Sequence, residues 1–293
     1  MAAMERPLVV GVDGSDPSLA ALDWAVEEAA RHELPLRLVH ASLWERYEGR
    51  VPSFARERPA GDVLAQHIVA SALERARLRR PEVKVSGDVL PEDPVSALLS
   101  AGHEAWSLVV GSRGRGELAG LTLGSVGLGV AARATCPVVV VRGGERNRQG
   151  VFGRVVVGVG DLPHCLETVR FAFREAAVGG SALHAVRAWR RPAPGHEGPR
   201  TAADGTSAHE ERASANLDEA LLQAVREHPD VDVTRTPVEG PPRQVLLEAS
   251  AGADLVVVGA MRRHGRHGLQ LGRVAHTLLH HAQCPVAVVP QRV

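Results

Sequence analysis

The chain of 293 residues contains one sequence pattern twice, and this repeat limits the folds that it can adopt. PLVVGVDG at 7–14 returns as RVVVGVGD at 154–161. The glycine-rich stretch at 107–142 returns at 254–290. A repeat of this length exceeds the units of solenoid proteins and has the size of a whole domain. The sequence therefore predicts a duplicated domain.

The spacing of the two copies sets the expected domain boundaries. LVHASLW at 38–44 is similar to ALHAVRAW at 182–189, so the similarity of the two copies extends to the segment between the two repeated motifs. We predict one domain at 1–144 and a second at 152–293. The polar, glycine-bounded segment GGERNRQGVFG at 143–153 is expected to be a linker.

Short apolar runs alternate with helical patterns within each copy, which favours an α/β fold. Alternation of this kind predicts a Rossmann-like domain, a five-stranded parallel sheet with helices on both faces. Polar, proline-containing segments at 42–61 and 190–209 are expected to be long loops. The first copy is predicted to have strands at 8–12, 36–41 and 83–89, helices at 62–80 and 94–106, and a strand, helix and strand within 107–142.

Glycines in the stretch at 107–142 follow the pattern G-x2-G-x9-G-S, from Gly111 through Gly114 to Gly124 and Ser125. Glycine has no Cβ to block the approach of a ligand and can adopt positive φ. A helix beginning at Ser125 would direct its free N–H groups towards a phosphate. The pattern indicates a phosphate-binding loop, and a tight strand-to-helix connection without a ligand is the simpler alternative.

Composition excludes several classes of protein. The formal net charge is zero and aromatic residues make up only 3% of the chain, so neither duplex nor single-stranded nucleic acid is expected as a partner. No apolar run approaches the roughly 18 residues of a membrane helix, and the first residues lack the long apolar region of a signal peptide. A cytoplasmic protein is expected, with Cys136, Cys165 and Cys284 as small buried thiols.

Lys84 is the only lysine, which excludes a Walker-type phosphate loop because that motif requires its own lysine. Any phosphate binding must therefore use backbone amides and arginines. Dinucleotide-type glycine patterns begin at Gly114 and Gly127, but both lie late in the domain rather than after its first strand. We reject that interpretation. No Ser-His-Asp order or G-x-S-x-G elbow is present.

With these motifs in place, the sequence resembles the universal stress protein family. VVGVDGS near the start, the spaced glycines and the closing CPVVVV carry the resemblance, which extends over nearly the whole chain. Its tandem arrangement is similar to that of two-domain members of the ATP-binding type. The resemblance implies an adenine nucleotide alpha hydrolase-like fold, the strand order 3-2-1-4-5, and ATP, with or without Mg²⁺, at the carboxyl ends of the strands.

The resemblance also implies which residues of the first copy bind the nucleotide. Val12 and Asp13 would contact the adenine or ribose, and Ala41 and Val89 would flank the base. The ribose and phosphates would be bound by the remaining candidates, Gly111, Arg113, Gly114, Arg115, Gly124, Ser125 and Val126.

Simpler functions exist for the charged candidates. Ser15 or Asp16 can cap the first helix, with Pro17 in its first turn, and Asp13 could serve merely as a further cap. Arg113 and Arg115 could be solvated loop charges, because single surface charges seldom matter.

The second copy departs from the glycine pattern, which predicts a weakened or altered site. Gly160 stands where the first copy has Asp13, and Asp161 beside it could substitute. Arginine replaces the second glycine and the serine of the motif, and each guanidinium could itself bind phosphate. The candidate residues of this second site are Gly160, Asp161, Gly259, Arg262, Gly272 and Arg273.

Histidines gather in the second copy, and His276 and His280 have the i, i+4 spacing that two metal ligands can use on a helix. No third ligand is evident in the sequence, so an exposed polar face is the favoured interpretation.

Taken together, the sequence predicts an ATP-binding regulator of stress or dormancy physiology that acts on an unidentified protein partner rather than a catalyst. A slow ATPase or nucleotidyl-transfer enzyme and a scaffold that binds no nucleotide are the alternatives. The final strands at 138–141 and 286–289 are expected to pair across the two domains as an internal pseudo-dimer, because unpaired edge strands are a liability. A homodimer of chains is a further alternative.

Overall fold

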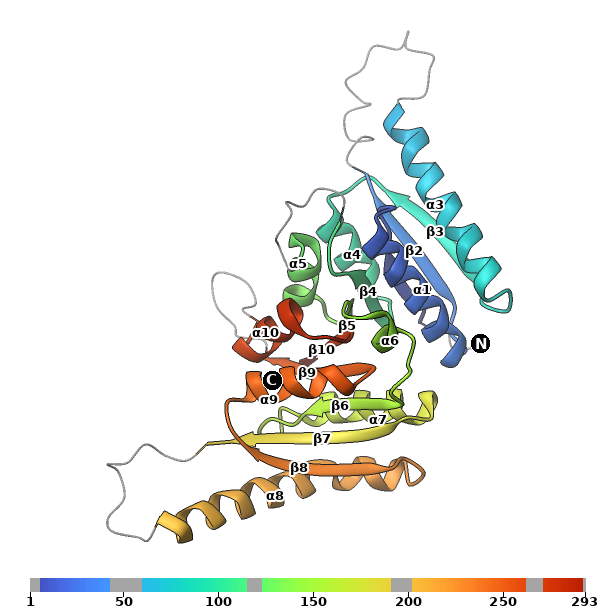
Figure 1. Cartoon of the computed structure of the whole chain (residues 1–293). Helices are drawn as coiled ribbons and strands as arrows, with labels where there is room; N and C mark the ends of the chain where they lie inside the picture. The colour runs from blue at the N-terminus through green and yellow to red at the C-terminus, as the bar shows by residue number, and fades with distance from the viewer. Residues whose placement is uncertain (1–5, 43–59, 115–122, 191–201, 262–270, 292–293) are drawn as a thin grey trace. The chain divides into compact units, whose positions relative to one another are not determined.

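Parallel strands alternate with helices through both halves of the chain in the computed structural model (Figure 1). The structure describes residues 6–42, 60–114, 123–190, 202–261 and 271–291. Contacts divide the chain into unit 1, Met1–Arg142, and unit 2, Gly143–Val293.

Unit 1 is a five-stranded parallel sheet with the order β3-β2-β1-β4-β5. Helices α1 and α3 pack together on one face of this sheet, and α4 and α5 pack together on the other. The predicted α/β class and strand order are confirmed. The elements are β1 Leu8–Gly11, α1 Asp16–Arg31, β2 Leu36–Ala41, α3 Ala60–Arg79, β3 Val85–Leu90, α4 Pro94–Gly102, β4 Ser107–Gly111, α5 Ser125–Arg133 and β5 Val138–Val141.

Unit 2 repeats this topology with the order β8-β7-β6-β9-β10, all parallel. Helices α7 and α8 pack together, as do α9 and α10. The elements are α6 Glu145–Arg148, β6 Arg154–Gly158, α7 Leu166–Gly179, β7 Ala182–Trp189, α8 Ala202–Glu227, β8 Val233–Glu239, α9 Pro242–Ala249, the 3₁₀ turn η1 Ser250–Gly252, β9 Leu255–Met261, α10 Arg273–His281 and β10 Val286–Gln291.

Each unit has its own hydrophobic core. The central strands read as continuous apolar runs because helices cover both of their faces. Fully buried side chains of unit 1 include Leu8, Leu22, Leu36, Leu38 and Leu108, and those of unit 2 include Phe171, Phe173, Leu183, Leu217 and Leu221.

The segment at 143–153 contains structure that the sequence did not predict. Helix α6 forms there, and the side-chain amide of Asn147 donates to the carbonyl oxygens of Ala253 at 2.7 Å, Ala251 at 3.3 Å and Ser250 at 3.4 Å. These carbonyls lie at the turn η1, so one buried side chain attaches α6 to unit 2. The segment that the sequence predicts as a linker therefore contains a short helix and belongs to unit 2.

Two predicted boundaries were wrong. Helix α4 ends at Gly102 rather than at 106, and the next strand begins at Ser107. Helix α8 begins at Ala202, within the loop expected at 190–209. Alanine and glutamate favour helix in this segment, and the His209 ring stacks on Trp189 with centroids 6.4 Å apart. Residues 43–59 and 191–201 of the two expected loops lie outside the described residues.

Strand pairing aligns β2 with β7 differently from the alignment that their similar sequences suggest. Val9 of β1 lies opposite Arg37, whereas the equivalent Val156 of β6 lies opposite His184. Arg187, three residues further along β7, therefore occupies the position of His40 in β2. Aligning the His-Ala pairs of the two segments was wrong by three residues.

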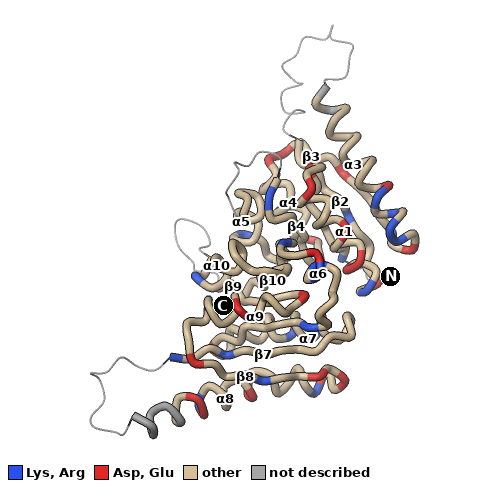
Figure 2. Tube along the Cα trace, viewed as in Figure 1, with Lys and Arg blue, Asp and Glu red and all other residues tan. Residues whose placement is uncertain are grey.

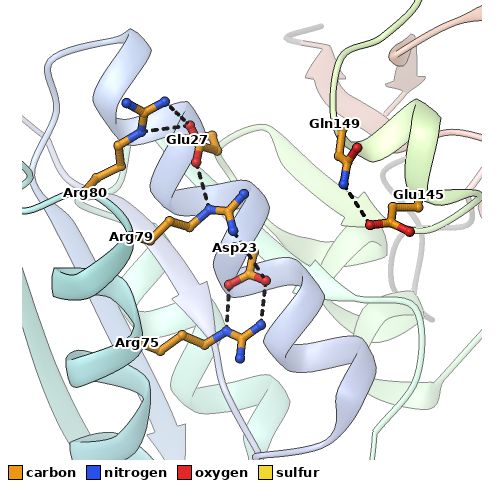
Figure 3. A network of polar contacts seen from close by, with 7 residues as sticks. All are labelled: Asp23, Glu27, Arg75, Arg79, Arg80, Glu145 and Gln149. Atoms are coloured by element: carbon orange, nitrogen blue, oxygen red, sulfur yellow. Dashed lines mark hydrogen bonds and ion pairs between the residues drawn. The ribbon is translucent and has the colours of Figure 1, made fainter.

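A network of ion pairs joins α1 to α3 in unit 1. Figure 2 shows basic residues gathered towards the end of α3, and Figure 3 shows their contacts with acidic residues of α1. Arg75 donates two hydrogen bonds of 2.7 Å to the Asp23 carboxylate, and the contact raises the pKa of Arg75. Arg79 and Arg80 donate to Glu27. The network fixes the exposed helix α3 against its neighbour.

The three cysteines are free and buried, as predicted. Burial of the Cys136 thiol raises its pKa to about 11, so it remains protonated near neutral pH. Among the described helices, none has the length and apolar character that crossing a membrane requires.

We expect Asp23→Asn to lower the free energy of unfolding of unit 1 by about 1 kcal/mol, because the bidentate pair with Arg75 loses its charge. Scanning calorimetry at low salt measures this change, and about 1 M NaCl should reduce it by screening. Glu74→Gln is the control, since Glu74 is an exposed carboxylate of α3 without an ion pair to any described residue. A variant that melts with the parent in low salt would show that the network adds no stability.

Candidate functional site

A cavity of about 340 Å³ lies at the carboxyl ends of β1, β2 and β4 in unit 1. This is the place where the strand order reverses, between β1 and β4, and open α/β sheets bind ligands at that point. Most of the residues predicted from the sequence line this one cavity. They are Val12, Asp13, Ala41, Gly111, Arg113, Gly114, Gly124, Ser125 and Val126.

One predicted residue is absent from the described lining, and another cannot be placed. Val89 lies in β3 opposite His40, one strand further from the reversal point. Arg115 lies outside the described residues.

The turn after β1 is held by its own polar side chains. Asp13 Oδ1 accepts hydrogen bonds from the Ser15 amide at 2.9 Å and the Ser15 hydroxyl at 2.6 Å. Ser18 Oγ accepts from the Asp13 amide at 3.0 Å. Gly14 between them has a φ of 77°, a conformation that favours glycine. The sequence S-D-P-S therefore shapes the cavity wall as well as starting α1.

Asp13 has a structural function without being the cap. The N-cap of α1 is Ser15, whose hydroxyl accepts from the Ser18 amide at 3.4 Å, and Pro17 lies in the first turn as predicted. Asp13 positions this cap through Oδ1. Its Oδ2 lies beside Gly114, because a Cβ built on Gly114 would be 2.7 Å from that oxygen. The carboxylate thus links the turn to the glycine motif.

Gly111 and Gly114 are glycine because a Cβ would come too close to neighbouring atoms there, and not because the backbone has positive φ. Gly111, Gly114 and Gly124 all have ordinary backbone angles, so the conformational part of the sequence argument was wrong. A Cβ on Gly111 would lie 2.6 Å from the Pro17 carbonyl oxygen and 2.7 Å from its carbon. Glycine at 111 lets the end of β4 touch the backbone of α1.

The amino end of α5 forms the opposite wall. Gly124 is its N-cap and has no side chain to satisfy the first amides, and its own amide donates to the Ser112 carbonyl at 2.8 Å. Ser125, Val126 and Gly127 of the first turn all line the cavity. The first amides of a helix have no partner within it, and the helix dipole gives this end partial positive charge. The wall is suited to an anion.

Arg113 is exposed at the rim of the cavity and has no ion pair with a described residue. A guanidinium here can reach a bound anion, and a solvated loop charge is equally consistent with its position.

His40 is a lining residue that the sequence analysis overlooked. Its Nδ1 lies 2.7 Å from the Val12 carbonyl oxygen. A carbonyl can only accept, so Nδ1 carries the hydrogen and Nε2 of the neutral ring is an acceptor. The signal was present in the sequence, because a histidine at the end of a predicted strand next to Ala41 faces the ligand edge of the sheet.

Leu98 of α4 is the second overlooked residue. It lines the cavity, and its side chain lies 3.1 Å from where a Cβ of Gly11 would be. Together with Val39 and Ala41 it makes part of the lining apolar.

The second set of candidates is only partly brought together. Gly272 is the N-cap of α10, as Gly124 is of α5, and Arg273 is the exposed first residue of that helix. The Asp161 carboxylate is 2.7 Å from Arg187 Nη2, and Gly160 precedes it in an exposed turn. Arg262 lies outside the described residues.

Gly259 in β9 is the equivalent of Gly111. Side chains lie against Gly259, whereas the backbone of Pro17 lies against Gly111. A Cβ on Gly259 would be 2.8 Å from both Gln291 Nε2 and Thr168 Oγ1.

His276 and His280 stack with ring centroids 4.5 Å apart on α10. Among the described residues, no third histidine, cysteine or carboxylate joins them at ligand distance. The geometry gives no support to a metal site.

Comparison with known proteins decides the family. The sequence model described as "Universal stress protein family" matches residues 4–142 and again 152–290. The chain belongs to the universal stress protein family. Both copies of the repeat are therefore domains of this family, consistent with the tandem arrangement that the sequence predicts.

Full-length relatives of the family share this arrangement. Universal stress protein Rv2005c of Mycobacterium tuberculosis is 32% identical, in an alignment that covers 98% of this chain and 98% of its own. Universal stress protein Rv2623 of the same organism is 30% identical, covering 96% of this chain and 95% of its own. A solved universal stress protein from Archaeoglobus fulgidus has the same fold, with a TM-score of 0.68 at 15% identity over 98% of this chain and 99% of its own.

We expect Gly111→Ala to destabilise unit 1 by about 1–3 kcal/mol, because the added methyl meets the Pro17 backbone, which cannot move without shifting α1. Gly127→Ala is the matched control, since its Cβ would meet Leu123 at 3.4 Å, the Gly111 carbonyl oxygen at 3.6 Å and Val110 at 3.8 Å, all ordinary contacts. Thermal denaturation followed by circular dichroism compares the two. Equal melting temperatures for the two variants would contradict the packing function assigned to Gly111.

Proposed function

We propose that unit 1 binds an adenine nucleotide, with ATP as the ligand, and that the chain acts as a nucleotide-dependent regulator of stress or dormancy physiology. The observation that carries the proposal is the cavity of about 340 Å³, a volume within the usual range of small-molecule sites. Membership of the universal stress protein family supports the physiological part.

The apolar part of the cavity suits the base. Val12, Val39, Ala41 and Leu98 lie together at the ends of the strands and on α4. A flat heteroaromatic ring gains from burial against such side chains, and a few polar groups fix its orientation. The His40 ring offers a hydrogen-bond acceptor beside them, and an exocyclic amino group is a matching donor.

The polar part suits the phosphates. The first turn of α5 brings the amides of Ser125, Val126 and Gly127 to the cavity wall, where the helix dipole favours negative charge. Arg113 at the rim can add charge-assisted hydrogen bonds to phosphate oxygens. Gly114 keeps the opposite side open, because any side chain there would meet Asp13.

Binding without efficient hydrolysis agrees with the residues present. Asp13 is the single carboxylate among the described lining residues, and its Oδ1 already holds Ser15. Lys84 donates nothing to this site, since it lies at the amino-terminal edge of the sheet, where its carbonyl accepts from the Leu36 amide. Mg²⁺ would be held chiefly by phosphate oxygens of the nucleotide.

The cytoplasmic location, the protein partner and the pairing of the two units remain predictions from the sequence.

Titration calorimetry of the full chain with ATP tests the proposal. We expect Gly114→Ala to weaken binding at least about tenfold, equivalent to about 1.4 kcal/mol, because the methyl displaces the Asp13 carboxylate into the site. The melting temperature should fall by no more than the loss of the Asp13–Ser15 hydrogen bonds accounts for, since the added methyl meets only the carboxylate of Asp13. Gly252→Ala is the control, because it lies in unit 2 and its Cβ has no neighbour closer than 3.8 Å.

Phosphate release measured on the same samples separates the alternatives. Bound ATP recovered intact supports a regulator, and steady turnover would make the protein an ATPase. Failure of the parent chain to bind ATP would contradict the proposal and favour the scaffold.

A further inference from the structure

We propose that the site of unit 2 is closed by one of its own side chains, Arg187, so that the chain carries one nucleotide. The inference rests on the nucleotide proposal for unit 1. It concerns residues that the glycine motif does not include.

The equivalence of the two sites follows from strand pairing. Gly11 lies opposite Val39, and Gly158 lies opposite Val186. The amide of Val12 donates to the Val39 carbonyl at 2.9 Å, and the amide of Val159 donates to the Val186 carbonyl at the same distance. The next residues of the second strands, His40 and Arg187, are therefore structural equivalents.

Arg187 is bound to the turn that would contact a ligand. Its guanidinium donates to the Gly160 carbonyl at 2.5 Å, to the Val159 carbonyl at 3.5 Å and to the Asp161 carboxylate at 2.7 Å. Its side chain is only 13% exposed although it lies at the end of a strand. Val159 and Gly160 are the equivalents of Val12 and Asp13, which line the cavity of unit 1.

The contrast with unit 1 is chemical as well as steric. His40 uses one ring nitrogen on the Val12 carbonyl and retains an acceptor at the other. Arg187 has only donors, and they are directed to three acceptors of its own chain. Asp161, the residue expected to replace the Asp13 carboxylate, is one of those acceptors. In unit 2, the groups that a ligand would contact are therefore already hydrogen-bonded within the chain.

The end of β9 is also packed differently from the end of β4. Helix α1 begins at Asp16, and its backbone at Pro17 touches Gly111. Helix α7 begins later in the repeat, at Leu166, and the side chains of Gln291 and Thr168 lie against Gly259 instead. Gln291 Nε2 donates to Thr168 Oγ1 and, at 3.2 Å, to the Val289 carbonyl.

The number of nucleotides bound per full-length chain tests the inference. Titration with ATP, and quantification of nucleotide released by denaturation, should both give one equivalent for the parent. Gly114→Ala should lower the occupancy of that equivalent, because it acts on unit 1 alone. Two equivalents for the parent would place nucleotide in unit 2 and overturn the inference. One equivalent that Gly114→Ala leaves at parental affinity would do the same. In both cases, nucleotide binding by the chain would remain intact. No binding by the parent would instead overturn the proposed function.

Hydrogen exchange tests the closure without any nucleotide. Arg187→His introduces the residue of unit 1, and Arg187→Gln keeps a donor at the same place. Both should speed exchange of the amides at 159–162 and 164 at least about tenfold, because neither side chain can reproduce the three contacts of the guanidinium, while peptides of unit 1 keep their parental rates. Arg190→His, an exposed arginine three residues further on, is the control. Unchanged exchange in both Arg187 variants would show that the arginine does not hold the turn, and would overturn the closure.

Discussion

The site of unit 1 depends on one close approach of two backbones. The end of β4 touches the first turn of α1 because residue 111 has no side chain, and the Pro17 carbonyl occupies the space that a Cβ would need. This contact brings the turn after β1 next to the turn after β4, although about a hundred residues separate them in the sequence. Asp13 then reaches Gly114, and the cavity forms between the two turns.

The local features of the fold could be predicted from the sequence, and the tertiary ones could not. Apolar periodicity placed the strands of unit 1, and the capping sequence S-D-P-S limited the cap of α1 to Ser15 or Asp16, of which the structure has Ser15. Helix α6 was missed because Asn147 is satisfied by carbonyls about a hundred residues away. The equivalence of Arg187 with His40 could not be predicted, because the similar His-Ala pairs suggest a register that only strand pairing can decide. The glycine motif identified the cavity, but for the wrong conformational reason at Gly111.

The two units solve the same structural problem with different chemistry. A turn that follows a buried parallel strand exposes amides and carbonyls that need partners. Unit 1 holds the turn with a carboxylate and two hydroxyls on the chain that follows it, and His40 reaches only one carbonyl. Unit 2 has Gly160, Leu162 and Cys165 at these positions and so lacks the carboxylate and both hydroxyls. An arginine from the neighbouring strand replaces them. The duplicated sequence has therefore kept the sheet while changing what holds its ligand edge.

The position of Lys84 has a practical consequence for following this protein by spectroscopy. It is the only lysine of the chain, it is exposed, and it lies at the edge of the sheet opposite the cavity of unit 1. An acylating dye therefore finds a single side-chain amine in the described structure, and the attached fluorophore stands clear of the ligand. The chain thus carries a natural attachment point from which changes in unit 1 can be observed without adding a cysteine.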